Sequence, residues 1–112
     1  MFMSQTVNIS SIFGKWNINV NTPFGKENYT LNITTNMLQD NINCVAGSIY
    51  HEKGSVAFND ARFENDIFHC SVETEFPIKS TISITAEFIE ENKMSGMLEI
   101  DQYLITSFIG VR

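Results

Sequence analysis

Apolar and polar residues alternate along most of the chain, in short runs that are separated by turn residues such as Gly, Asn and Asp. In the clearest run, Ile82, Ile84, Ala86 and Phe88 alternate with polar or charged neighbours. An alternation of period two is typical of a β-strand with one buried face. Runs of this kind occur at 15–20, 28–34, 42–50, 56–58, 67–74, 81–88, 94–100 and 104–111.

Strands that each carry one apolar face must bury that face against one another. Short links between successive runs favour pairing between neighbours, and closing the sheet removes its unpaired edges. The sequence therefore predicts an all-β fold, a single antiparallel eight-stranded up-and-down β-barrel, with a two-sheet β-sandwich as the alternative. One domain is expected over residues 1–112, and residues 1–12 are expected to be irregular or to form a short helix.

The sequence predicts which side chains of the third run face outward and how long the strand formed by the fourth run is. The alternation in the third run is interpreted with Val45 and Ile49 facing outward. The fourth run is expected to be short, with a turn at Asn59 and Asp60 and a link that contains Phe63. The residues of the third run expected to face the interior are Cys44, Ala46, Ser48 and Tyr50.

Length and charge narrow the possible partners. The chain has 112 residues, of which 43% are hydrophobic, and this is the composition of a globular domain. The formal net charge is −6 and the seven basic residues are scattered, which argues against nucleic acid as a partner. No secretory signal and no long apolar helix are recognised, so a cytoplasmic protein without a membrane partner is expected.

The sequence offers little for catalysis or metal binding. Cys44 and Cys70 alternate in phase with apolar residues and are expected to be buried, reduced thiols. No CxxC or HxxxH spacing is present, so no metal site is expected. His51 is expected in a turn and His69 on the outer face of a strand, both at the surface. We therefore predict no catalytic residues and no cofactor, and an enzyme is the less favoured class.

The tripeptide Gly14-Lys15-Trp16 at the start of the first strand resembles the Gly-x-Trp opening of the calycin barrels, which include lipocalins, fatty-acid-binding proteins and avidins. In those families the Trp plugs one end of the barrel, and a basic residue from the last strand often packs over it. Arg112 stands at the matching place in this chain. The resemblance implies a barrel in which Trp16 closes one end beneath Arg112.

The expected function follows from the interior of such a barrel. An eight-stranded barrel is wide enough to be packed shut or to hold one small ligand. The favoured hypothesis is a module that binds a small apolar or aromatic molecule inside the barrel, with Tyr29, Ser48 and Tyr50 as polar anchors. Two alternatives stay open: an accessory or interaction domain with a filled core, and a cofactor-free barrel isomerase or cyclase.

The eighth run is apolar on both faces, with Ile105, Ile109 and Val111 on the side expected to face outward. Contiguous apolar surface is rare on monomers, so a cover is expected. The favoured cover is a second copy in a homodimer. The alternative is the N-terminal segment, which carries the apolar residues Phe2, Val7, Ile9 and Ile12.

Overall fold

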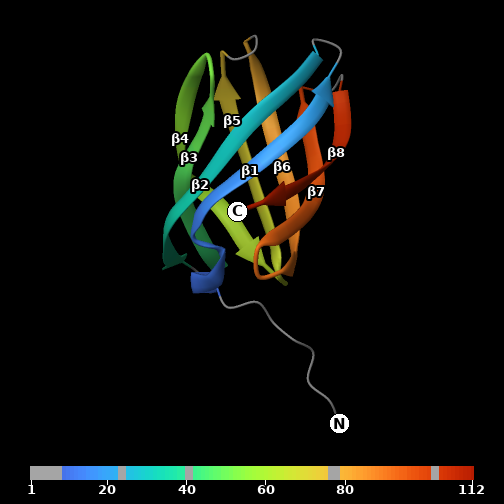
Figure 1. Cartoon of the computed structure of the whole chain (residues 1–112). Helices are drawn as coiled ribbons and strands as arrows, with labels where there is room; N and C mark the ends of the chain where they lie inside the picture. Colours follow the sequence, from blue (N-terminus) through green and yellow to red (C-terminus); the bar gives the residue numbers. More distant parts are fainter. Residues whose placement is uncertain (1–8, 23–24, 40–41, 76–78, 102–103) are drawn as a thin grey trace.

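The computed structural model describes residues 9–22, 25–39, 42–75, 79–101 and 104–112. Eight antiparallel strands close into a barrel, each pairing with its neighbours in sequence, and β8 returns to β1 (Figure 1). The predicted fold is therefore confirmed. A short 3₁₀ turn, η1, precedes the first strand. The elements are η1 (Ile9–Ile12), β1 (Gly14–Thr22), β2 (Gly25–Gln39), β3 (Ile42–His51), β4 (Gly54–Glu64), β5 (Ile67–Thr74), β6 (Ser80–Glu90), β7 (Lys93–Ile100) and β8 (Leu104–Val111).

Pairing around the barrel is uneven. Strands β1 to β4 pair along most of their lengths, and so do strands β5 to β8. In contrast, β4 and β5 pair over residues 62–64 and 67–69, and β1 and β8 pair at residues 17–18 and 110–111. The barrel thus consists of two four-stranded sheets that are joined by two short ladders.

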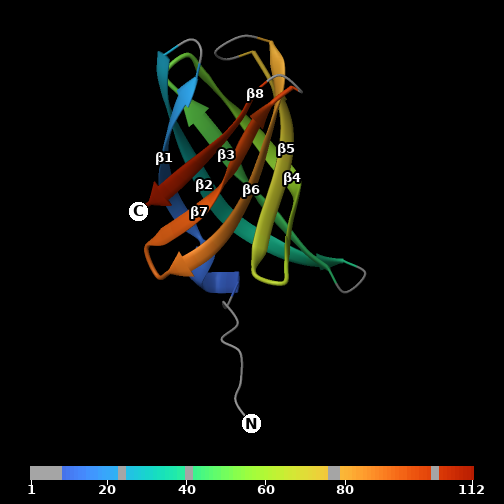
Figure 2. The same ribbon diagram turned by 90° about the vertical axis from the view of Figure 1, so that its right-hand side faces the viewer.

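Both short ladders lie at the end of the barrel that holds Trp16. Residue 17 of the β1–β8 ladder follows Trp16 directly, and Phe63 of the β4–β5 ladder packs on Phe88, which in turn packs on Trp16. Figure 2 shows η1 and the turn between β4 and β5 at this same end. The two sheets are therefore joined at the Trp16 end, which we call the closed end, and part towards the other, the open end.

The faces of β3 are the reverse of the expected ones. Val45 and Ile49 are fully buried, whereas Tyr50 is 44% exposed. The register explains the inversion, because Ile49 pairs with the buried Leu31 of β2 and must point the same way. A one-residue change of phase moves every side chain of a strand to the opposite face, so Cys44, Ala46 and Ser48 also leave the interior and are only half-buried.

Strand β4 is longer than predicted. It runs through Asn59 and Asp60, where the register against β3 shifts between Val45 and Gly47. The expected turn at these residues is therefore wrong, and the extra residue is a β-bulge. The bulge allows both Phe58 and Ala61, three positions apart, to be buried, and it brings Phe63 into the core instead of a link.

The structure describes the N-terminal segment from residue 9 onward. Residues 9–12 form the 3₁₀ turn, and Ile12 is fully buried in the core. Phe2 and Val7, which were considered as a cover for β8, lie outside the described residues. Because Ile12 is part of the core, it does not cover the outer face of β8.

Candidate ligand-binding site

Trp16 and Arg112 close one end of the barrel. The Trp16 ring is fully buried, and its Nε1–H donates to the carbonyl oxygen of Ile12 at 2.9 Å. The guanidinium carbon of Arg112 lies 4.3 Å from the centre of the Trp16 ring. Arg112 also donates to the carbonyl oxygens of Phe13 at 2.8 Å and Glu91 at 2.7 Å. The last residue of the chain therefore ties together the start of β1 and the turn before β7.

Aromatic rings fill the interior above this plug. Phe88 packs edge-on against Trp16 with ring centroids 5.2 Å apart, and against Phe63 at 5.9 Å. Phe58 and Phe68 form a second edge-on pair at 6.1 Å. Side chains of this size in contact leave the closed half of the barrel as a packed core.

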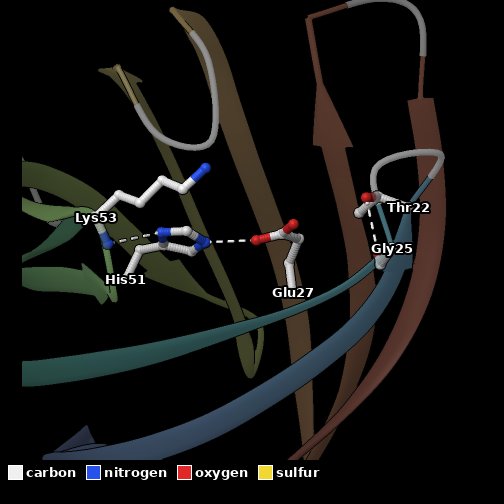
Figure 3. A network of polar contacts seen from close by, with 5 residues as sticks. All are labelled: Thr22, Gly25, Glu27, His51 and Lys53. Carbon is white, nitrogen blue, oxygen red and sulfur yellow. Dashed lines mark hydrogen bonds and ion pairs between the residues drawn. The ribbon is translucent and has the colours of Figure 1, made fainter.

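Polar side chains enter the barrel towards the open end (Figure 3). The backbone N–H of Lys53 donates to Nδ1 of His51 at 3.1 Å, so Nε2 carries the ring proton and donates it to Oε1 of Glu27 at 2.5 Å. His51 is only 8% exposed, and its expected place at the surface is therefore wrong. His69 is exposed as expected, with Nδ1 at 2.8 Å from Oγ1 of Thr85.

The β1–β2 hairpin frames this end of the barrel. Oγ1 of Thr22 donates to the carbonyl oxygen of Gly25 at 2.9 Å, as Figure 3 shows. Gly25 has a φ of 109°, a conformation that favours glycine. This hairpin places Glu27, two residues further on, opposite Val20 and within reach of His51.

Tyr29 faces the interior, as predicted, and its ring lies 5.1 Å from the His51 ring between centroids. The Tyr29 hydroxyl oxygen is fully buried, and no described residue forms a hydrogen bond with it. Burial, and then the nearby Glu27 carboxylate, raise the pKa of Tyr29 to about 12. Tyr29 is therefore a neutral hydrogen-bond donor across the physiological pH range.

The other two predicted anchors do not join Tyr29. Ser48 and Tyr50 share the outer face of β3, so the expectation that they face the interior is wrong. Tyr50 instead lines a depression of ≈ 250 Å³ on the outside of the barrel, together with residues that include Lys26 and Thr30. The three predicted residues thus lie on both sides of the barrel wall.

A larger cleft of ≈ 880 Å³ lies at the open end, where the start of β4 and the end of β5 are no longer paired. Sequence patterns missed it because its residues belong to strand ends and turns, and alternation carries no information about where two strands part. The lining residues are Lys53, Gly54, Ser55, Val56, Glu73, Thr74, Glu75, Lys79, Ser80, Thr81 and Asp101.

The cleft combines both signs of charge with hydroxyl groups. Asp101 is held rigidly, because its Oδ1 accepts from the Thr81 N–H at 2.8 Å and its own N–H donates to the Thr81 carbonyl oxygen at 2.7 Å. Thr74 and Ser80 are buried at the floor, and Val56 adds an apolar contact. Such a lining suits a molecule that carries hydrogen-bonding groups beside an apolar part.

Three comparisons, with protein families, with curated proteins and with solved structures, find no match to this chain. Within the described ranges, no group of three or more His, Cys, Asp or Glu side chains is placed to hold a metal ion. Among the same residues, no helix is both long and apolar enough to cross a membrane.

Proposed function

We propose that this protein is a binding module that takes a small molecule at the open end of the barrel. The observation that carries the proposal is the cleft of ≈ 880 Å³ between β4 and β5. Small-molecule sites typically have volumes of about 300–1,000 Å³. The closed end is plugged and the middle is filled, so the open end is where a ligand has room.

The lining of the cleft defines the ligand class. Lys53 and Lys79 offer cationic donors, whereas Glu73 and Asp101 offer carboxylates. A ligand with hydrogen-bonding groups and a modest apolar part fits this lining better than the wholly apolar molecule expected from the sequence. Tyr29 does not line this cleft, so its buried hydroxyl is not part of the proposed contact surface.

Two further observations support binding without turnover in a calycin-like barrel. The plug formed by Trp16 and Arg112 matches the arrangement implied by the resemblance to calycin barrels. Both ring nitrogens of His51 are engaged, by Glu27 and by the Lys53 N–H, so this histidine holds the wall of the barrel together. A general base needs an accessible lone pair, which this arrangement does not offer.

Native mass spectrometry tests the proposal. Protein purified without denaturant is examined for a retained small molecule and is then exposed to a library of small amphiphilic metabolite-like compounds. We expect the wild-type protein to carry or capture a compound, and Val56→Trp, which enlarges a side chain on the inner face of β4 that lines the cleft, to lose it. The matched control is Ala57→Trp, at an exposed position of the same strand outside the cleft. Retention by Val56→Trp, or no binding by wild type, would contradict the proposal.

A further inference from the structure

The outer faces of β7 and β8 carry a contiguous apolar surface, which we call the β7–β8 patch. Outward strand residues on an antiparallel sheet are normally polar. The patch consists of Met97 (45% exposed), Ile105 (60%), Ile109 (47%) and Val111 (44%). Val111, Ile109 and Ile105 lie opposite Lys93, Ser95 and Glu99 of β7, and Met97 lies opposite Ser107. A surface of this kind on a soluble domain marks an interaction site.

The register gives the patch an internal symmetry. Gly96 pairs with Phe108 at the middle of the two strands. Three residues to one side of Gly96 lies Lys93, and three residues to the other side lies Glu99. On β8, Ile105 and Val111 stand at the same distances from Phe108. Opposite charges therefore flank the centre of β7, and matching apolar residues flank the centre of β8.

We propose that the β7–β8 patch binds a second copy of this chain, with the two-fold axis crossing β7 and β8 at the Gly96–Phe108 pair. Rotation about this axis reverses the strand direction, so Lys93 lies against Glu99 of the partner subunit. Ile105 then lies against Val111 of the partner subunit. Nearest the axis, Met97 lies against Ser95 of the partner subunit, and Ile109 lies against Ser107 of the partner subunit. Three residues from the axis, β7 contributes two equivalent ion pairs and β8 two equivalent apolar pairs, which is the arrangement of a self-complementary two-fold contact.

The charges select this axis over axes parallel to the strands. An axis that runs along β7 sets Lys93 against its own copy and Glu99 against its own copy, and like charges in contact disfavour association. A parallel axis between β7 and β8 sets Lys93 against Val111 of the partner subunit and Glu99 against Ile105 of the partner subunit, which leaves both charges unpaired against apolar side chains. Neighbouring strands do not disturb the chosen arrangement. On β6, the axis passes Ala86, so Glu87 faces Thr85 of the partner subunit. On the other side, Val111 neighbours the uncharged Asn17 of β1.

This proposal is independent of the cleft, because no residue that lines the cleft belongs to the patch. Sedimentation equilibrium tests it on the full chain. At concentrations well above a micromolar dissociation constant, we expect a mass twice that of the 12.7 kDa chain. Lys93→Glu or Glu99→Lys alone should weaken the dimer roughly tenfold, since each places two like-charge pairs in the interface. The double swap Lys93→Glu/Glu99→Lys should return the dissociation constant to within about threefold of wild type.

Two further variants separate the patch from other surfaces. Ile109→Lys should leave a monomer, because it buries an unpaired charge at the centre of the patch. Ile67→Lys, on the outer face of β5 at 42% exposure, should leave the dimer intact. Circular dichroism confirms that each variant is folded. A wild-type monomer, a dimer that survives Ile109→Lys, or a double swap as weak as the single reversals would overturn the proposal, and a monomer would point to a different protein as the occupant.

Discussion

At the scale of single residues, Arg112 and Trp16 do more than fill space. The guanidinium lies close enough to the indole for a cation–π contact and still donates to backbone oxygens on two separate segments, Phe13 and Glu91. A lysine has no planar group to stack on the indole, and its three donors sit on a single nitrogen, whereas Arg112 uses two separate nitrogens for the two oxygens. The closed end therefore depends on Arg112.

Trp16→Ala should lower the free energy of unfolding by about 3–5 kcal/mol, because a fully buried aromatic side chain is lost and a cavity remains. Arg112→Ala should cost about 1–2 kcal/mol through its charged hydrogen bonds and its stacking. Urea unfolding measures both changes. Lys15→Ala, at the exposed position between Gly14 and Trp16, serves as the control and should change stability by less than about 0.5 kcal/mol. A Trp16→Ala midpoint equal to that of wild type would contradict the plug.

The two thiols should differ in reactivity, contrary to the expectation that both are buried. Cys70 is 1% exposed, and burial, followed by the charge of Asp60, raises its pKa to about 12. Cys44 lies on the outer face of β3, opposite the exposed Arg62. Because the thiolate is the reactive form, we expect a thiol reagent to modify Cys44 in the native state and Cys70 only after unfolding.

Mass spectrometry of peptides after brief native labelling measures this difference. Cys44→Ala should abolish the native reaction, whereas Cys70→Ala should leave it in place. Rapid labelling of Cys70 would mean that the β5 side chains do not face the interior as described.

At the scale of elements, alternation predicted where the strands lie, and pairing decided which way they face. Every run became a strand, and the inward positions of β1, β2, β5 and β6 were predicted correctly. In β3 both faces carry small or apolar residues, so the local pattern does not decide which of the two faces points into the barrel. The pairing of Ile49 with Leu31, residues far apart in sequence, settles the phase. The bulge in β4 was missed because Asn59-Asp60 is equally typical of a turn.

The difference between local alternation and long-range strand pairing also explains which features of the candidate site could be predicted from the sequence. The inward orientation of Tyr29 was predicted correctly because it belongs to an unambiguous run, whereas Ser48 and Tyr50 were assigned the wrong phase of β3. The cleft arises where β4 separates from β5, and this depends on the register of the whole sheet. The burial of His51 depends on Glu27, which reaches it from another strand. No local pattern in the sequence encodes either feature.

Gly47 is the residue at which β2, β3 and β4 fit together. A Cβ atom here would overlap the carbonyl oxygen of Asn32 and come within 2.9 Å of the Phe58 ring. Because the obstacle is backbone, the strands must move apart to accept it, and Gly47→Ala should cost about 1–3 kcal/mol in thermal or urea unfolding. Ser48→Ala, at the next position on the outer face, is the matched control. Equal stability of the two variants would show that β2 and β3 do not approach as closely as described.

At the scale of the whole molecule, the barrel is a pair of four-stranded sheets joined at one end. The two short ladders, the aromatic core and the Trp16–Arg112 plug all lie towards the closed end. Towards the open end the sheets part, the side chains become polar, and the cleft forms. Rigid packing at one end thus supports the proposed site at the other, as a scaffold does for a binding site.

Amide chemical-shift mapping of the isotope-labelled protein, titrated with the compounds that native mass spectrometry identifies, tests this account most directly. The account predicts saturable shifts at the open end, at residues 53–56 of the β3–β4 hairpin, at Thr74, at Ser80–Thr81 and at Asp101, with little change around Trp16. Shifts that cluster on the β7–β8 patch or at the closed end, or an absence of shifts in the presence of every compound, would contradict it.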